Sequence, residues 1–413
     1  MEDKRLLIVS THFPPDSRPG THRVIRFAKY LVQLGWNIHV LTLRTDAALY
    51  KHLRDASLLN KIPSSVKVHS TAALRLCWPF SGFNSYLVPD KEAGWIPFAC
   101  NKGLKIIREH DITVLYSTAP PWTTHVTCWW LKKKTGVKWV ADIRDPWTRR
   151  PWMPAEDRSG VRYSLLKKIE RTVVNSADRV ILNTAHLHKD FCSYYRNIDP
   201  EKFLTIPNGI DADDFVGLDG AKSSVDRFVV THGGSLYRKR DPRPFLQALS
   251  ELVRDKVIAE SDLLVRFLGS VDAKFDLHGW VREHKLESMV RIEPPIAHDQ
   301  YLKALSSSDV LLLIQPDTDL QVPSKLFEYM AVGKPVLALA HSGATSEAVA
   351  EYGHGIVVEP YDVNSIKNEI IRLLKAERRA ETNDVSHGEG LVKWSAAATS
   401  QKLDSVLREY LAI

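Results

Sequence analysis

The stretch Val322-Pro-Ser-Lys-Leu-Phe-Glu-Tyr-Met-Ala-Val-Gly-Lys-Pro-Val336 decides the fold of this chain. An apolar run over 311–314 precedes it and predicts a fully buried parallel strand. Ser324 is expected to be the N-cap of a helix over 325–332, with Gly333 at its C-terminal end. The next strand begins where the stretch ends. A helix N-terminus therefore follows the carboxyl end of a strand, and this arrangement binds phosphate in open α/β sheets.

Two charged side chains of this helix extend the prediction. Lys325 would place a positive charge at the helix N-terminus, and Glu328, one turn further, offers a carboxylate suited to a ribose diol. The alternative is an ordinary amphipathic helix that packs Leu326, Tyr329 and Met330 inward. A short Ser-Lys-x-x-Glu pattern occurs often by chance, so the assignment needs support from other stretches.

A second stretch, His232 to Arg240, supplies that support. Gly233-Gly234 follows an apolar run over 228–231, and basic residues follow at 238–240. Glycines allow the backbone to approach a diphosphate, and cations neutralise its charge. The alternative is a solvated basic turn. The residues predicted to bind the diphosphate and ribose of a nucleotide ligand, the donor, are Gly20, Gly234, Ser235, Arg240, Ser324, Lys325 and Glu328.

The first half of the chain holds the remaining candidates. A strand over 5–10 leads through a polar loop to Gly20 at the start of a helix, as in folds whose backbone approaches a nucleotide. Arg144 and Asp145 follow another strand and are predicted to be catalytic, although an ion pair that fixes the loop is an equal alternative. His125, near a helix start, is a further catalytic candidate, with a core or capping role as its alternative.

These stretches resemble the group 1 (family 4) glycosyltransferases, which have the GT-B fold. The segment Glu328-Tyr-Met-Ala-Val-Gly-Lys-Pro-Val336 is similar to the carboxyl-terminal signature of that family, and Pro207-Asn-Gly-Ile-Asp211 to the end of its first domain. Leu320 stands where the family usually has the first of two glutamates, and Arg144 where many members have histidine. Both departures affect how the donor sugar would be held.

The resemblance implies an α/β chain with two doubly wound Rossmann-like domains facing a cleft. We expect an acceptor-binding domain over 1–212, a nucleotide-sugar-binding domain over 225–390, and a C-terminal helix over 391–413 that packs back toward the first domain. A polar linker lies near 217–226, and residues 46–100 show no clear period and are interpreted as a variable excursion.

The implied activity is metal-independent, retaining transfer of a sugar from a UDP- or GDP-linked donor, without a cofactor. The product would belong to cell-surface polysaccharide or glycolipid assembly. One alternative is a sugar-nucleotide epimerase on the same fold. Another is a non-catalytic protein that binds nucleotide sugars or a membrane surface. Donor turnover separates the enzymes from the binding protein, and dependence on an acceptor separates a transferase from an epimerase.

Charge is distributed unevenly along the 413 residues. Residues 1–210 contain 32 basic and 18 acidic side chains, whereas the remainder contains 24 and 31. The basic half favours an anionic or lipid-linked acceptor, or a membrane surface. Nine of the eleven tryptophans precede residue 153, some of them beside the basic clusters 132–134 and 149–150. They could be interfacial anchors or ordinary packing residues. No nucleic-acid recognition motif accompanies the basic half.

The four cysteines are scattered without a Cys-x-x-Cys pair, and no apolar run reaches the length of a membrane span. No metal site and no disulfide framework are therefore expected. The protein is expected in the cytoplasm, and the inner face of the membrane is a candidate site within it.

Overall fold

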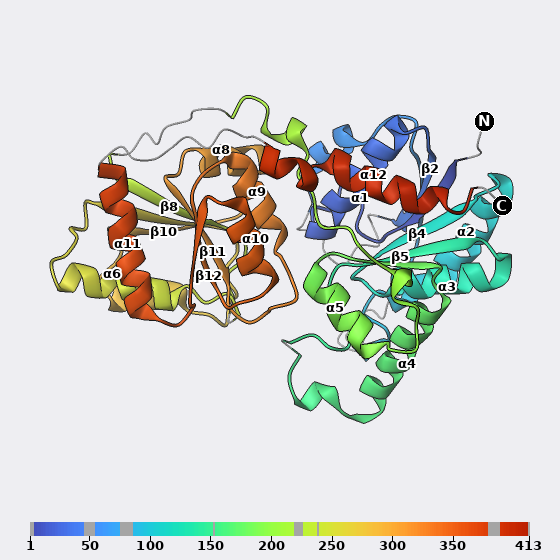
Figure 1. The fold of residues 1–413 in the computed structure, drawn as a ribbon, viewed down its shortest axis with the longest axis horizontal. Coiled ribbons are helices and arrows are strands. Elements are labelled where there is room, and N and C mark those ends of the chain that lie inside the picture. Colours follow the sequence, from blue (N-terminus) through green and yellow to red (C-terminus); the bar gives the residue numbers. More distant parts are fainter. Residues whose placement is uncertain are drawn as a thin grey trace. The chain divides into compact units, whose positions relative to one another are not determined.

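The computed structural model describes residues 4–44, 54–74, 86–151, 153–218, 226–237, 239–378 and 389–411. The chain divides into two compact units (Figure 1). Unit 1 comprises residues 1–209 and 396–413, and unit 2 comprises 210–395. Most of the predicted linker, residues 219–225, lies outside the described residues.

Unit 1 is a parallel sheet with the strand order β3-β2-β1-β4-β5-β6-β7. Its strands are β1 (Arg5–Val9), β2 (Asn37–Leu43), β3 (Lys67–Thr71), β4 (Val114–Ala119), β5 (Lys138–Ile143), β6 (Arg179–Leu182) and β7 (Phe203–Thr205). Its helices are α1 (Pro19–Gln33), α2 (Ile96–Glu109), α3 (Thr123–Thr135), α4 (Gly160–Ser176), α5 (Ala185–Tyr194) and α12 (Ala396–Arg408).

The last helix, α12, lies against the first, α1, although they come from opposite ends of the chain (Figure 1). Leu403 and Leu407 of α12 are buried in one cluster with Phe27 and Leu31 of α1. The indole of Trp36 donates a hydrogen bond to Asp404, with 2.7 Å between the two atoms. The C-terminal segment thus completes the core of unit 1.

Unit 2 repeats the architecture with the strand order β10-β9-β8-β11-β12-β13. Its strands are β8 (Phe228–Gly233), β9 (Leu263–Leu268), β10 (Val290–Glu293), β11 (Val310–Gln315), β12 (Val336–Ala340) and β13 (Gly355–Val358). Its helices are α6 (Arg243–Arg254), α7 (Leu277–Glu283), α8 (His298–Ser306), α9 (Ser324–Val332), α10 (Ala344–Tyr352) and α11 (Val363–Arg378).

The central strand β11 shows why this sheet needs helices on both faces. Leu312 and Ile314 belong to the cluster with α6, α7 and α11, whereas Leu311 and Leu313 belong to the cluster with α8, α9 and α10. Every residue of β11 is buried, so the strand appears in the sequence as an apolar run over 310–314 that ends at Gln315. The prediction of two doubly wound Rossmann-like domains is confirmed.

The interpretation of residues 46–100 as a variable excursion is wrong in two places. β3 is an edge strand whose side chains are half-buried or exposed, so it lacks an apolar pattern. Helix α2 begins at Ile96, so only its first turn falls within 46–100, and Gly103 lies on its buried face. A Cβ atom on Gly103 would lie 2.8 Å from Leu131 of α3, so close packing of the two helices explains the glycine. Residues 45–53 and 75–85 lie outside the described residues.

Two element boundaries also differ from the prediction. β8 continues to Gly233, so His232 and Gly233 belong to a strand and not to a loop. Helix α9 begins at Ser324 with Pro323 as its N-cap residue, so the expected N-cap role of Ser324 is wrong. Proline before the helix fixes an extended backbone, and Ser324 takes helical geometry with an exposed side chain. Gly333 ends the helix in the left-handed conformation, as predicted.

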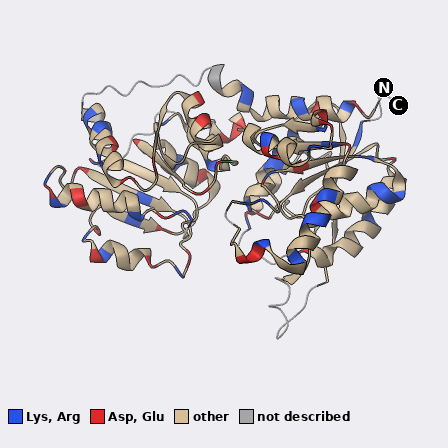
Figure 2. Cartoon of the chain, turned by 60° about the horizontal axis from the view of Figure 1, so that its bottom comes forward, with Lys and Arg blue, Asp and Glu red and all other residues tan. Residues whose placement is uncertain are grey.

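Figure 2 marks the positions of Lys and Arg and of Asp and Glu along the backbone, and both kinds occur in both units. Within the described residues, no helix combines the length and the apolar character that crossing a membrane requires.

Candidate functional site

Unit 2 carries a group of polar residues where the strand order changes direction. β8 has β9 on one side and β11 on the other, and β11 leads to α9. In doubly wound sheets, ligands bind outside the carboxyl ends of the strands at such a point. The residues placed there are the loop after β8 and the first turn of α9.

Lys325, in the first turn of α9, is only 8% exposed and points toward β8. Its ammonium group lies 3.3 Å from Nε2 of His232. Nδ1 of His232 lies 2.9 Å from the backbone oxygen of Leu312, which can only accept a hydrogen bond. Nδ1 therefore carries the proton, and Nε2 accepts from Lys325. The neutral imidazole positions the lysine without neutralising it.

Lys325 forms no ion pair with a carboxylate of the described residues, although the Glu328 charge is near enough to act on it. Burial and then the positive charge of Arg240 hold the pKa of Lys325 well below its ordinary value, and Glu328 opposes that shift. No described carboxylate lies within 4 Å of the charged nitrogens of Lys325 or Arg240. The Arg240 guanidinium lies 5.5 Å from the ring centre of Tyr237. Two nearby cations without a carboxylate partner favour binding of an anion.

Glycines bring the backbone next to this charge. Gly234 has φ +110°, and a Cβ atom there would lie 2.8 Å from Nζ of Lys325. The amide of Gly233 donates a 2.8 Å hydrogen bond to the hydroxyl of Tyr329. Ser235 is exposed, and its hydroxyl is hydrogen-bonded to that of Ser270 at 2.8 Å. A side chain at position 234 would displace the lysine, so glycine is required there.

Glu328 is half-buried, one turn after Lys325, and faces Tyr301 of α8. Burial, followed by the Glu328 carboxylate, raises the pKa of the Tyr301 phenol well above its ordinary value. The Tyr301 ring lies so close to Gly233 that a Cβ atom there would be 2.3 Å from it. Leu320, where the family has its first glutamate, is half-buried in the loop before α9.

Sequence reasoning missed His232 and Tyr301. His232 immediately precedes the Gly-Gly pair, so its proximity to the loop was visible, but the helix that opposes it was not. Tyr301 belongs to a helix that comes before β11 in the chain, and no local pattern indicated its contact with Gly233.

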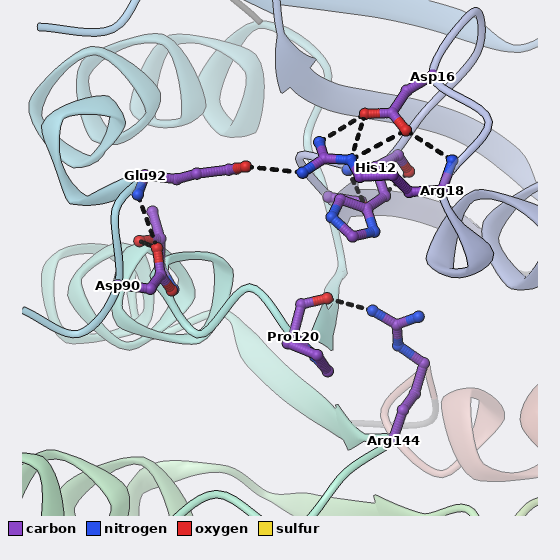
Figure 3. A network of polar contacts seen from close by, with 9 residues as sticks. His12, Asp16, Arg18, Asp90, Glu92, Pro120 and Arg144 are labelled. Atoms are coloured by element: carbon purple, nitrogen blue, oxygen red, sulfur yellow. Dashed lines mark hydrogen bonds and ion pairs between the residues drawn. The ribbon is translucent and has the colours of Figure 1, made fainter. Parts of the chain in front are cut away.

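Unit 1 carries a second polar group, after the carboxyl ends of β1, β4 and β5 (Figure 3). The Arg144 side chain donates hydrogen bonds to the backbone oxygens of Ala119, at 3.3 Å, and Pro120. A Cβ atom on Gly20 would lie 2.5 Å from both Nη1 of Arg144 and Nδ1 of His12. The first residues of α1 thus approach Arg144 because position 20 has no side chain.

His12 lies among positive charges. It is 9% exposed, and neither ring nitrogen has a hydrogen-bond partner in the described part of the chain. Burial, then Arg18, Arg144 and Lys91, lower its pKa well below the ordinary value. Arg18 is held by Asp16 and, at 3.0 Å, by Glu92 (Figure 3).

Arg144 and Asp145 are half-buried, and the guanidinium donates to backbone oxygens instead of to Asp145. The neighbouring Asp145 charge nevertheless opposes the burial that lowers the pKa of Arg144. The hydrogen-bond partners of the Arg144 guanidinium are thus neutral carbonyl groups, as the partner of Lys325 in unit 2 is a neutral imidazole.

Two other residues near Arg144, Asp142 and His125, are buried and hydrogen-bonded within unit 1. Asp142 is fully buried in β5 and accepts two 2.8 Å hydrogen bonds from Arg23 and one of 2.7 Å from Tyr116. His125 has no exposed surface, and Nδ1 lies 2.8 Å from the hydroxyl of Ser117. Burial lowers the pKa of His125 to about 3. It lies within the packed interior of unit 1, which agrees with the core alternative for this residue.

Two family models match the chain in succession. The model described as glycosyltransferase family 4 matches residues 20–214, and the model described as glycosyl transferases group 1 matches residues 220–385. Together they include both polar groups except His12, Asp16 and Arg18.

Two curated relatives show the similarity of this chain to proteins of known name. D-inositol 3-phosphate glycosyltransferase 2 of Catenulispora acidiphila is 23% identical over 96% of this chain and 93% of its own length. A D-inositol 3-phosphate glycosyltransferase of Kineococcus radiotolerans is 28% identical, but the match covers only 45% of each chain.

Solved structures share the fold over nearly the whole chain. Sucrose-phosphate synthase of Thermosynechococcus elongatus has a TM-score of 0.73 at 16% identity and covers 99% of both chains. HepE of Anabaena, in complex with UDP-glucose, has a TM-score of 0.67 at 15% identity and covers 98% of this chain and 99% of its own. The Listeria monocytogenes structure described as a UDP-N-acetylglucosamine 2-epimerase has a TM-score of 0.61 at 11% identity, covering 98% and 96%.

Proposed function

Because this chain belongs to the group 1 glycosyltransferases, we propose that it transfers a sugar from a nucleotide-diphosphate sugar to an acceptor with an anionic group. The observation that carries the donor half of this proposal is the buried Lys325, whose charge has no carboxylate partner in the described residues. A diphosphate would supply the missing negative charge.

The donor diphosphate would lie between Lys325, Arg240 and the backbone of Gly234, against the N-terminus of α9. In the transfer step, the bond between the sugar and the diphosphate breaks, and the diphosphate leaves with the electron pair. An acceptor hydroxyl oxygen forms the new bond to the sugar carbon, and its proton passes to the departing phosphate oxygen. Cations already fixed in a buried site stabilise the charge that develops on it. They take the role that a metal ion has in other transferases, so we propose that transfer needs no metal. We also propose that transfer retains the anomeric configuration, as the resemblance to the group 1 glycosyltransferases implies.

The acceptor would bind in unit 1 through Arg144, with Asp145 beside it and Lys91 and His12 nearby. The names of the relatives describe transfer involving D-inositol 3-phosphate, which carries such an anionic group. We propose a phosphorylated polyol or a lipid-linked phosphate as the acceptor, with a product in cell-surface polysaccharide or glycolipid assembly. His125 would hold the surrounding fold and not contact the substrate.

A membrane surface remains a second part of the proposal. Trp129 and Trp130 of α3 are half-buried, with the ammonium groups of Lys133 and Lys134 within 5.7 Å of their ring centres. Arg149 contributes less, because Glu170 and Asp190 each pair with it at 2.8 Å. Trp152 lies outside the described residues. The face with Trp129 and Trp130 would bring a lipid-linked acceptor and the enzyme together near the cytoplasmic leaflet.

Acceptor-dependent turnover tests the proposed reaction. The protein is incubated with a panel of UDP- and GDP-linked sugars, alone and with inositol phosphates or lipid-linked phosphates in vesicles, and products are identified by mass spectrometry. We expect release of nucleoside diphosphate together with a glycosylated acceptor. A changed sugar nucleotide without any acceptor would establish the epimerase alternative, and binding without turnover of any donor would establish the non-catalytic alternative.

Glu328 gives a separate prediction about the nucleotide. If its carboxylate accepts hydrogen bonds from the ribose hydroxyls, wild-type protein should bind UDP or GDP about tenfold more tightly than the 2′-deoxy form, as expected for a charge-assisted bond of about 1.5 kcal/mol. Glu328→Gln should reduce this difference to about threefold or less by calorimetry. An unchanged preference for ribose in the variant would assign Glu328 to a structural role beside Tyr301.

A further inference from the structure

Three histidines far apart in the sequence meet in unit 1. His39 lies on β2, His69 on β3, and His110 at the C-terminal end of α2. Nδ1 of His39 is 3.0 Å from Nε2 of His69, and the ring centres of His39 and His110 are 4.2 Å apart. One ring nitrogen from each of the three residues lies within 4.8 Å of the other two.

The register of the sheet produces this meeting. His39 is paired with Lys67, and His69 lies two residues after Lys67 on β3. The side chains of His39 and His69 therefore point to the same face of the sheet. Side chains on the same face of adjacent strands are within reach of one another in this diagonal relation. Helix α2 packs on β2 and β3 and ends at Glu109, which brings His110 over the pair.

The surroundings leave nitrogen lone pairs for a ligand. His39 has no exposed surface, and its Nε2 has no hydrogen-bond partner among the described residues. His69 and His110 are partly exposed, so an ion could reach the three rings from solvent. Burial, followed by His110, His69 and Lys67, lowers the pKa of His39 to about 4, so its ring is neutral at pH 7.

Neighbouring charges set a limit on the affinity. Lys102 and Lys67 lower the pKa of His69, and Glu109 opposes them. Positive charge that favours neutral imidazoles also repels a cation, so this site should be weaker than a zinc site whose ligands include thiolates or carboxylates.

We propose that His39, His69 and His110 bind one divalent transition-metal ion of the zinc class. Imidazole nitrogens are preferred ligands of Zn²⁺, Ni²⁺ and Cu²⁺, and three of them leave a fourth position for water. Tetrahedral coordination at about 2.1 Å places ligand nitrogens about 3.4 Å apart, so side-chain shifts of about 1 Å would close the site. The ion would replace the contact between His39 and His69.

The position suggests a stabilising role. His110 precedes β4, so it lies toward the amino ends of the strands, whereas Gly20 and Arg144 follow the carboxyl ends of β1 and β5. The ion would tie the edge strand β3 and the end of α2 to β2 without taking part in sugar transfer. Sequence spacing gave no signal, because the ligands come from three elements that are separated by about 30 and 40 residues.

Zinc binding by the full chain, without a histidine tag, tests the proposal. Native mass spectrometry gives the stoichiometry, calorimetry with ZnCl₂ gives the affinity, and Co²⁺ absorption in the visible range reports four-coordinate geometry. We expect one ion per chain and a higher melting temperature with zinc, since a ligand that binds only the folded state stabilises it. His69→Ala and His110→Ala should each lower the affinity at least tenfold.

His188→Ala is the matched control, because His188 is also half-buried in unit 1 and makes a 2.9 Å contact with Thr205. It should bind zinc as wild type does. Circular dichroism of the zinc-free variants checks that they fold, and His110→Gln serves as a second variant if His110→Ala does not. Absence of stoichiometric zinc, or equal zinc affinity in wild type and in the folded cluster variants, would overturn the proposal.

Discussion

Lys325→Met should remove most of the affinity for a nucleoside diphosphate without destabilising the free protein. Losing a charge-assisted contact to the diphosphate costs about 1.5–3 kcal/mol, or roughly ten- to 150-fold in affinity. Methionine fills a similar volume and eliminates a buried cation, and replacing such charges by apolar groups is often neutral or stabilising, by up to about 4 kcal/mol. The unpaired Nε2 of His232 offsets part of that gain. Calorimetry and thermal unfolding measure the two effects.

Lys367→Met provides the control. Lys367 is half-buried in unit 2 and pairs with Glu251 at 2.8 Å, so the same substitution should lower the free energy of unfolding by about 0.5–1 kcal/mol and leave nucleotide affinity unchanged. If Lys325→Met instead lowered the melting temperature strongly and kept its affinity for nucleoside diphosphate, Lys325 would be a structural residue.

The same lysine gives nucleotide binding a pH dependence. In the free protein, burial and Arg240 lower the pKa of Lys325, whereas a bound diphosphate favours the charged form and raises it. Affinity should therefore be greatest below the free-state pKa and fall as pH rises through it toward the pKa of the complex. Between the two values, binding takes up a proton, which calorimetry detects as a heat that depends on the buffer. Lys325→Met should lack this uptake.

Arg144→Ala should slow transfer by weakening the interaction with the acceptor, without changing the interaction with the donor. Removing a cation that contacts an anionic acceptor should lower kcat/KM for the acceptor by about 30- to 150-fold, equivalent to about 2–3 kcal/mol. The affinity of unit 2 for nucleoside diphosphate should stay unchanged, because Lys325 and Arg240 are intact. Steady-state kinetics with varied acceptor, together with calorimetry of the nucleotide, separate the two effects.

Arg158→Ala is a matched control for Arg144→Ala. Arg158 also donates to backbone oxygens, those of Arg150 and Pro151 at 3.1 and 2.9 Å and that of Met153. Its loss should leave the acceptor KM within about twofold, since exposed contacts contribute little. Equal effects of the two substitutions would show that Arg144 only supports its loop.

The fold was predictable because its central strands are buried on both faces. A continuous apolar run such as 310–314 and the glycines at 234 and 333 specify strands, loops and helix ends by local chemistry. The edge strand β3 was not predictable in this way, since one exposed face and few neighbours leave no apolar pattern. Pro323 fixed the start of α9 more strongly than the capping preference of Ser324.

The position of a candidate site residue was predictable where a local pattern marks the end of a strand, while the role of each residue stays a prediction. Gly234 and Lys325 each follow a strand end, and the structure brings them together. His232 and Tyr301 were missed because their roles depend on contacts between separate elements. His12 was missed for the same reason, since the cations around it come from the loop before α1, from Lys91 and from the end of β5.

The central claim is that unit 2 binds a diphosphate through Lys325, and one calorimetric comparison tests it. UDP and UMP, and GDP and GMP, are titrated into wild-type protein and into Lys325→Met. For the preferred base, wild-type protein should bind the diphosphate at least tenfold more tightly than the monophosphate, and the variant should bind the two within about threefold. Equal binding of the diphosphate and the monophosphate by wild type, or an undiminished preference in the variant, would contradict the claim.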